Sequence, residues 1–266
     1  FKGRAQIVVG AENIEVRWGS DLKQPEPIQQ IITKLEGGQY TEAVRLLEKL
    51  RRYQPNEIVV LYNLGMALSD MGQLEQAEQI LRHAVMAAPD HVNARIALGV
   101  SLARQGRHAE AVPVLQEAVT QAPKNPWAYR NLAGCLMTLG QVADAETAMR
   151  RAVELNPADP QSLFGLAKIL QGNGEFKEAD ALYVKVIDID KRSPIAEAAK
   201  DELTKLAQQS FRSATAGVER PDAIMYCLSA LQHFDKMTPA EIQKIGFEIA
   251  ILGQNGLKTN EPAQQY

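Results

Sequence analysis

Apolar residues return along this chain at a fixed interval. Alanine occurs at Ala43, Ala77, Ala111, Ala145 and Ala179, each 34 positions after the one before. A large residue follows four positions later at Leu81, Leu115, Met149 and Tyr183, and after three more positions stands Ala84, Ala118, Ala152 or Val186. These spacings place the small and large residues on one face of a helix. The hydrophobic pattern therefore predicts one helix that recurs five times.

Glycine and proline follow the same interval and divide each unit into two helices. Glycines stand at Gly38, Gly72, Gly106, Gly140 and Gly174, and prolines at Pro55, Pro89, Pro123 and Pro157. Glycine enters the left-handed conformation of a helix C-terminus without steric cost, so we expect turn glycines at the ends of the first helices. Asn125-Pro126 and Asp159-Pro160 each predict a capped helix start. The pattern predicts helix-turn-helix units at 24–57, 58–91, 92–125, 126–159 and 160–193.

The interval and its residues resemble the tetratricopeptide repeat family. Leu64-Gly65, Leu98-Gly99, Leu132-Ala133 and Leu166-Ala167 match the Leu-Gly pair in the first helix of that repeat. The resemblance covers residues 24–191. It implies an all-α fold in which paired helices stack into a right-handed superhelix, and a function in binding other proteins.

Three segments flank the predicted repeats. Residues 1–23 predict an extended arm, in which 5–18 alternate like a hairpin that packs on the helices or on a neighbouring chain. Residues 194–212 predict an amphipathic capping helix. Residues 221–256 predict a further helical pair, which we expect to belong to a longer domain.

Composition excludes several classes of function. A net charge of -3 supplies no general attraction for nucleic acid, and no apolar run approaches the ~20 residues that cross a membrane. The two cysteines, Cys135 and Cys227, suit reduced thiols, so we expect a cytoplasmic protein whose N-terminus at Phe1 is processed or trimmed.

Catalytic and metal-binding patterns are missing from the sequence. The four histidines have no second ligand at metal-binding spacing, and Cys135 lies in an apolar helix with no cationic neighbour to activate it. We therefore expect no enzyme activity, no metal and no cofactor.

The resemblance implies a concave groove lined by the first helix of each unit. It places eleven residues there: Tyr62, Asn63, Met66, Asn93, Ile96, Arg104, Trp127, Arg130, Asn131, Phe164 and Lys168. Aromatic and arginine side chains are typical of binding hot spots. Alternatively, Tyr62, Trp127 and Phe164 pack against the next helix.

Two known ligand modes of the family involve these positions. Asn63 and Asn131 match asparagines that hold a peptide backbone in O-linked N-acetylglucosamine transferases, although Ala97 and Gly165 interrupt the series. The carboxylate clamp of chaperone-binding members matches at only one of five places. Glu36 and Asp70 precede Arg104, Arg130 and Lys168 along the array, so we expect acidic groups of a peptide against repeats three to five.

The sequence leaves three hypotheses for function. The first is a non-catalytic adaptor that binds a partner peptide in the groove. The second is the substrate-recruiting arm of a larger enzyme whose catalytic domain lies beyond Tyr266. The third is self-association through the N-terminal arm.

Overall fold

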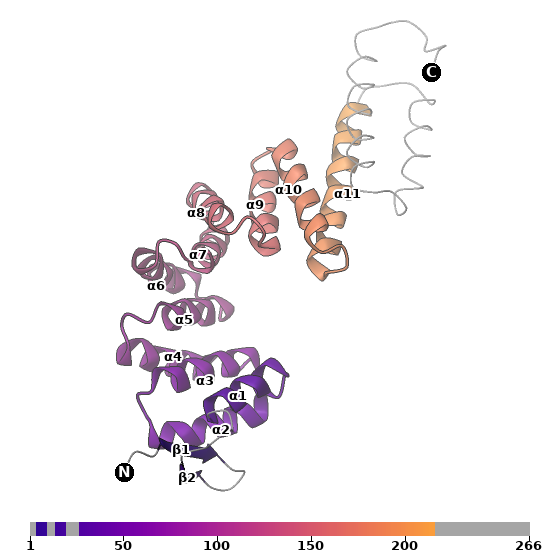
Figure 1. Cartoon of the computed structure of the whole chain (residues 1–266). Helices are drawn as coiled ribbons and strands as arrows, with labels where there is room; N and C mark the ends of the chain where they lie inside the picture. Colours follow the sequence, from indigo (N-terminus) through magenta and orange to yellow (C-terminus); the bar gives the residue numbers. More distant parts are fainter. Residues whose placement is uncertain (1–3, 10–13, 20–26, 216–266) are drawn as a thin grey trace, which may run out of the picture. The chain divides into compact units, whose positions relative to one another are not determined.

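The computed structural model describes residues 4–9, 14–19 and 27–215, with side chains from 28 to 208 (Figure 1). The chain divides between Ala148 and Met149 into two compact units. The expected turn at 10–13 and the expected helical pair at 221–256 lie outside the described residues. The right-handed superhelical path across all five repeats stays a prediction.

The first unit contains a hairpin followed by helices in pairs. Its elements are β1 (Arg4–Val9), β2 (Ile14–Gly19), α1 (Pro27–Glu36), α2 (Tyr40–Tyr53), α3 (Ile58–Asp70), α4 (Leu74–Ala87), α5 (Val92–Arg104), α6 (His108–Gln121) and α7 (Pro126–Thr138), and α8 (Val142–Leu155) spans the division. β1 and β2 are antiparallel, with Ile7 opposite Val16, and β1 lies beside α1. We call α1, α3, α5, α7 and α9 the A helices, and α2, α4, α6, α8 and α10 the B helices.

Each turn from an A helix to its B helix is closed by a glycine, as predicted. The backbone φ angles of Gly38, Gly72, Gly106, Gly140 and Gly174 all lie between 72° and 83°. In the second repeat, the backbone N–H of Gly72 donates to Ser69 O at 3.0 Å, and that of Gln73 donates to Leu68 O at 2.9 Å. This pair of bonds is the Schellman cap, and it satisfies carbonyls that the helix end leaves open. The other four turns repeat the same two bonds.

The helices of a pair touch where a small residue faces a large one. Ala77 and Ala111 are fully buried on α4 and α6. A Cβ added at Gly65 of α3 would lie 2.5 Å from Leu81 Cγ of α4, and one added at Gly99 of α5 would lie 2.5 Å from Leu115 Cγ of α6. Missing side chains therefore let α3 approach α4, and α5 approach α6, closely.

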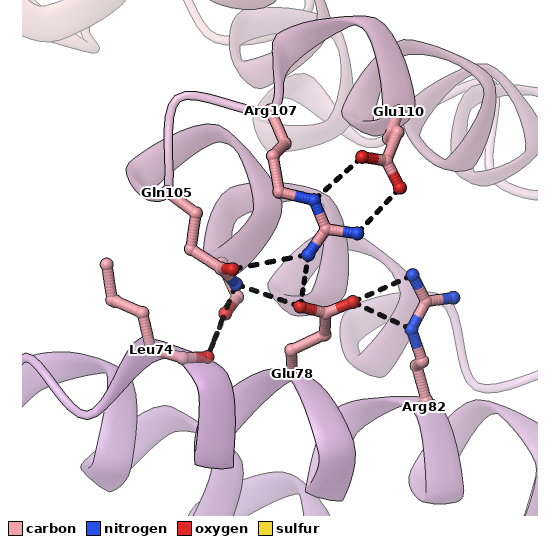
Figure 2. Close-up of polar contacts among 7 residues, drawn as sticks. Leu74, Glu78, Arg82, Gln105, Arg107 and Glu110 are labelled. Carbon is pink, nitrogen blue, oxygen red and sulfur yellow. Dashed lines mark hydrogen bonds and ion pairs between the residues drawn. The ribbon is translucent and has the colours of Figure 1, made fainter.

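A polar network joins the second repeat to the third. Figure 2 shows the carboxylate of Glu78 on α4 accepting hydrogen bonds from Arg82, Gln105 and Arg107, while Arg107 also binds Glu110. Partial burial raises the pKa of Glu78, but the three hydrogen bonds outweigh it and lower that pKa overall. Because Gln105 and Arg107 flank the turn glycine Gly106, the network ties this turn to the preceding B helix.

The third repeat carries a charged residue at a core position. Arg95 on α5 is only 6% exposed, and it binds Gln121 and Glu117 of α6. The matching positions of two other repeats hold Leu61 and Leu163, both buried. A buried guanidinium needs such partners because its desolvation is costly.

The second unit continues the helical pairs and adds a long helix. Its complete helices are α9 (Pro160–Gly172), α10 (Phe176–Ile189) and α11 (Pro194–Thr215). α11 packs on α10 and α9, and buries Ala196, Ala199, Leu203 and Leu206. It occupies the place expected for the helix over 194–212.

A carboxylate holds α11 to α9. Glu202 of α11 accepts from Lys168 Nζ at 3.1 Å and from Gln171 Nε2 at 3.2 Å, both on α9, and from Lys205 Nζ at 2.8 Å. Gln171 in turn accepts from the hydroxyl of the buried Tyr183 at 2.6 Å. Burial raises the pKa of Glu202, but the bonds from Lys205, Lys168 and Gln171 outweigh it and lower that pKa to about 2.

The packing of A against B helices predicts that a larger side chain lowers the stability of the protein at buried positions of a B helix but not at exposed ones. Replacing the fully buried Ala111 by leucine should lower the free energy of unfolding by about 1 to 3 kcal/mol, because the added atoms force α5 and α6 apart. Replacing the exposed Ala109 of the same helix by leucine should change it by less than about 0.5 kcal/mol. Urea denaturation of both variants measures the difference, and equal midpoints would contradict this packing.

The lowered pKa of Glu202 predicts a pH-dependent contribution to stability. The folded state binds this proton less readily than the unfolded state, so the contribution is present above pH ~4.5 and lost as the pH falls toward 2. Glu202→Gln should therefore lower stability by about 1 to 2 kcal/mol at pH 7, allowing for solvent screening of the lysines. Urea denaturation between pH 7 and pH 2 should show the parent and the variant converging. A difference that is independent of pH would contradict this assignment.

Candidate binding surface

Three A helices of the first unit form one surface. α5 lies between α3 and α7 and contacts both. Nine of the eleven predicted site residues come from these helices. Eight of the nine are at least partly exposed: Tyr62, Asn63 and Met66 on α3, Asn93 and Arg104 on α5, and Trp127, Arg130 and Asn131 on α7. We call this surface the A-helix face. The ninth residue from these helices, Ile96, is only 8% exposed and packs in the interior, so its assignment to the groove is wrong.

The two asparagines use their amides within their own helices. Asn63 Nδ2 donates to Val59 O at 2.7 Å, and Asn131 Nδ2 donates to Trp127 O at 2.7 Å. Each side chain is thus fixed against the preceding turn of its helix. Each bond uses one N–H of the side-chain amide and leaves its second N–H and its Oδ1 for a peptide backbone, so the comparison with the asparagine series stays a prediction.

The three predicted aromatic residues differ in their surroundings. The ring of Tyr62 lies 5.5 Å from that of His91, and burial raises the pKa of its hydroxyl. In the second unit, Phe164 meets Tyr183 edge to face at 5.5 Å. Both rings are half-buried against neighbouring side chains. Trp127 is 54% exposed and is therefore the most exposed of the three to solvent.

The first turn of α7 fixes the backbone of Trp127. Asn125 caps this helix, and its Oδ1 accepts from the backbone N–H of Trp127 at 3.0 Å and of Ala128 at 3.3 Å. Pro126 occupies the first turn, where its missing N–H breaks no helical bond. The sequence predicted this cap, which presents an exposed indole on a rigid backbone.

Two of the predicted cationic residues, Arg104 and Lys168, bind carboxylates of this chain. Arg104 Nη1 lies 3.3 Å from Asp70 Oδ1 and donates to Ser69 Oγ at 2.9 Å. In the second unit, Lys168 binds Glu202. The expected separation of acidic and basic residues along the array is therefore reduced, because Asp70 of the second repeat is the partner of Arg104 of the third.

A pocket of about 290 Å³ opens on the A-helix face between α5 and α7. Its lining consists of Val100, Ala103 and Arg104 from α5, His108 and Leu115 from α6, and Arg130, Asn131, Gly134 and Cys135 from α7. The structure thus brings together three predicted site residues: Arg104, Arg130 and Asn131. Burial raises the pKa of the Cys135 thiol, which suits an apolar lining residue better than a nucleophile.

His108 was not predicted to belong to the site. It begins α6, is half-buried and lines the pocket. Its counterparts in the other repeats are Tyr40, Leu74, Val142 and Phe176, all aliphatic or aromatic. A basic residue at a recurrent hydrophobic position was the signal that could have found it.

The described part of the chain holds neither a metal cluster nor a membrane span. Across residues 4–9, 14–19 and 27–215, no three His, Cys, Asp or Glu side chains gather in a way that could hold a metal ion. Within the same ranges, no helix is long and apolar enough to cross a membrane.

The repeat geometry agrees with family models. Three models of the tetratricopeptide repeat match residues 62–126, 102–162 and 160–193. The chain is a tetratricopeptide repeat protein. No curated protein matches its sequence.

Solved structures of other proteins share the fold. MamA from Desulfovibrio magneticus RS-1 is 25% identical, with a TM-score of 0.54 over 62% of this chain and 94% of that chain. A thermophilic TPR protein of Thermus thermophilus, TTC0263, is 22% identical, with a TM-score of 0.59 over 66% of this chain and 97% of that one. YrrB, described as a TPR protein with an unusual peptide-binding site, is 18% identical, with a TM-score of 0.51 over 65% and 90%.

The pocket predicts an unusual gain in stability at Gly134. A Cβ added there meets no atom within 4 Å, so Gly134→Ala should raise the free energy of unfolding by about 0.5 to 1 kcal/mol, because glycine is a poor helix former. Gly65→Ala should lower it, since its Cβ would lie 2.5 Å from Leu81 Cγ. Thermal and urea denaturation of both variants test the pair. A loss of stability in Gly134→Ala would show that this glycine is required for packing.

Proposed function

We propose that this chain is a non-catalytic scaffold that binds an extended segment of a partner protein on its A-helix face. Tetratricopeptide repeat proteins are generally protein-binding scaffolds, and the matching family models are all of such repeats. The peptide-binding site attributed to YrrB supports the idea that a fold of this kind can hold a peptide.

The observation that carries the proposal is an exposed tryptophan on the same helix face as a pocket. On α7, Arg130, Asn131 and Gly134 lie three, four and seven residues after Trp127, so all four share one face of that helix. Indole and guanidinium side chains beside a pocket are typical of interface hot spots. A bound segment that covers Trp127 would therefore also cover the pocket.

Charge gives the bound segment an expected orientation. Arg104 and Arg130 line the pocket, whereas Tyr62, Met66 and Trp127 supply half-buried or exposed apolar surface on α3 and α7. The bonds from Arg104 to Ser69 and Asp70 both use Nη1, so its Nε and Nη2 have no partner among the described residues. Acidic groups of the partner would lie toward the third and fourth repeats, because complementary charge fixes orientation.

This proposal predicts which substitutions weaken capture of a partner. With a partner recovered by affinity purification from the source organism, Trp127→Ala should weaken binding by about 2 kcal/mol or more, roughly 30-fold. Arg130→Glu should weaken it in a way that diminishes at high salt. Isothermal titration calorimetry at two ionic strengths measures both effects.

A matched control lies away from the proposed surface. Met86 is 79% exposed on α4, a B helix, so Met86→Ala also removes a large exposed apolar side chain. It should leave the affinity unchanged. A partner that binds Trp127→Ala as tightly as the parent, or that is sensitive only to Met86→Ala, would place the binding surface elsewhere.

A further inference from the structure

We propose that the pocket between α5 and α7 receives one glutamate side chain of the bound segment. This inference rests on the proposed function and names the side chain that anchors the partner. It follows from three properties of the pocket: the glycine that opens it, the apolar floor beneath cationic groups, and a histidine nitrogen without a partner.

The pocket exists because Gly134 has no side chain. The matching positions of the neighbouring repeats hold Met66, Val100 and Lys168, all much larger. Gly134 lies within α7, does not have a positive φ, and has open space where a Cβ would stand. Neither a turn nor close packing therefore requires glycine here, although glycine weakens a helix. What this residue provides is room on the A-helix face.

The lining of the pocket fits an aliphatic stem that ends in a single negative charge. Val100, Ala103, Leu115 and Cys135 supply apolar surface, and Arg104 and Arg130 supply positive charge. None of the lining residues is a carboxylate. A carboxylate that enters the pocket can form charge-assisted hydrogen bonds with guanidinium groups, whereas a purely apolar side chain cannot.

His108 adds a second, independent sign that a polar group is missing. Among the described residues, its Nδ1 is the buried side-chain polar atom that has no hydrogen-bond partner. Native structures rarely leave such atoms unsatisfied. Since α6 begins at His108, the positive end of that helix also lies at the pocket and favours an anion there.

Size and charge separate glutamate from other acidic groups. About 290 Å³ lies at the lower limit of pockets that hold whole small molecules, and it leaves ample room for a single side chain. Glutamate has one more methylene than aspartate, so its stem covers more of the apolar floor. A phosphate carries nearly two charges, whereas Arg104 already shares its charge with Asp70.

Direct titration of the whole chain with small probes tests the inference. The probes are N-acetyl-glutamate amide, its neutral isostere N-acetyl-glutamine amide, and N-acetyl-O-phosphoserine amide, added to ¹⁵N-labelled protein. The glutamate probe should shift the backbone amide resonances of Gly134 and Cys135 in a saturable way. The glutamine probe should bind at least ten times more weakly, and the phosphoserine probe should bind no better than glutamate.

Two glycine variants distinguish the pocket from a general effect of surface charge. Gly134→Met fills the pocket with the residue found at the matching position 66, so the glutamate probe should lose at least ten-fold in affinity while the fold is kept. Gly172→Ala changes a glycine of α9 that likewise has no neighbour within 4 Å, and binding should not change. His108→Leu restores the apolar type of the other repeats and should weaken binding several-fold.

Three results would overturn the inference. One is the absence of any shift at Gly134 and Cys135, another is equal affinity for the glutamate and glutamine probes, and the third is tight binding of glutamate by Gly134→Met. Tighter binding of the phosphoserine probe would replace glutamate by a phosphorylated side chain. Failure of the probes together with loss of partner binding in Trp127→Ala would leave the scaffold function standing and remove only the glutamate anchor.

Discussion

The close approach of each A helix to its B helix determines the rest of this structure. It depends on residues that lack bulk: Ala77 and Ala111 on the B helices, and Gly65 and Gly99 opposite Leu81 and Leu115. A side chain of ordinary size at these places could not be accommodated without moving a helix. Because the same contact recurs, α3, α5 and α7 emerge side by side, and their outward residues form a continuous face.

Polar contacts add to this apolar framework in particular places. Glu78 joins α4 to the turn before α6, and Glu202 joins α11 to α9. Both carboxylates bind several donors at once, which compensates for the water that they lose. Arg104 takes part in two features of the structure, because it binds Asp70 of the preceding repeat and also lines the pocket. Charge on the A-helix face is therefore partly committed to holding the repeats together.

The sequence was sufficient to predict the helices, because their signals repeat five times. The turn glycines, the cap at Asn125 and the buried alanines all stand where the 34-residue interval placed them. The interval also assigned most outward positions of α3, α5 and α7 correctly. What it could not predict were departures from the pattern within one repeat, such as the burial of Ile96 and Arg95. The Arg104–Asp70 pair was missed for another reason, since each residue looked like part of a separate charged region. Predicting the pocket would have required both a comparison between the repeats and the three-dimensional structure. Gly134 and His108 each differ from their counterparts in the other repeats, but only the folded chain shows that both line one pocket.

The identical caps at the five turns have a consequence for how such a chain can change in length. Each Schellman cap is made by backbone groups around one glycine, so the direction in which the chain leaves an A helix does not depend on the neighbouring side chains. The pocket needs only α5, α6 and α7. Duplication or loss of a whole 34-residue unit at either end would therefore preserve the pocket. Proteins descended from this one could differ in their number of repeats and keep the same pocket.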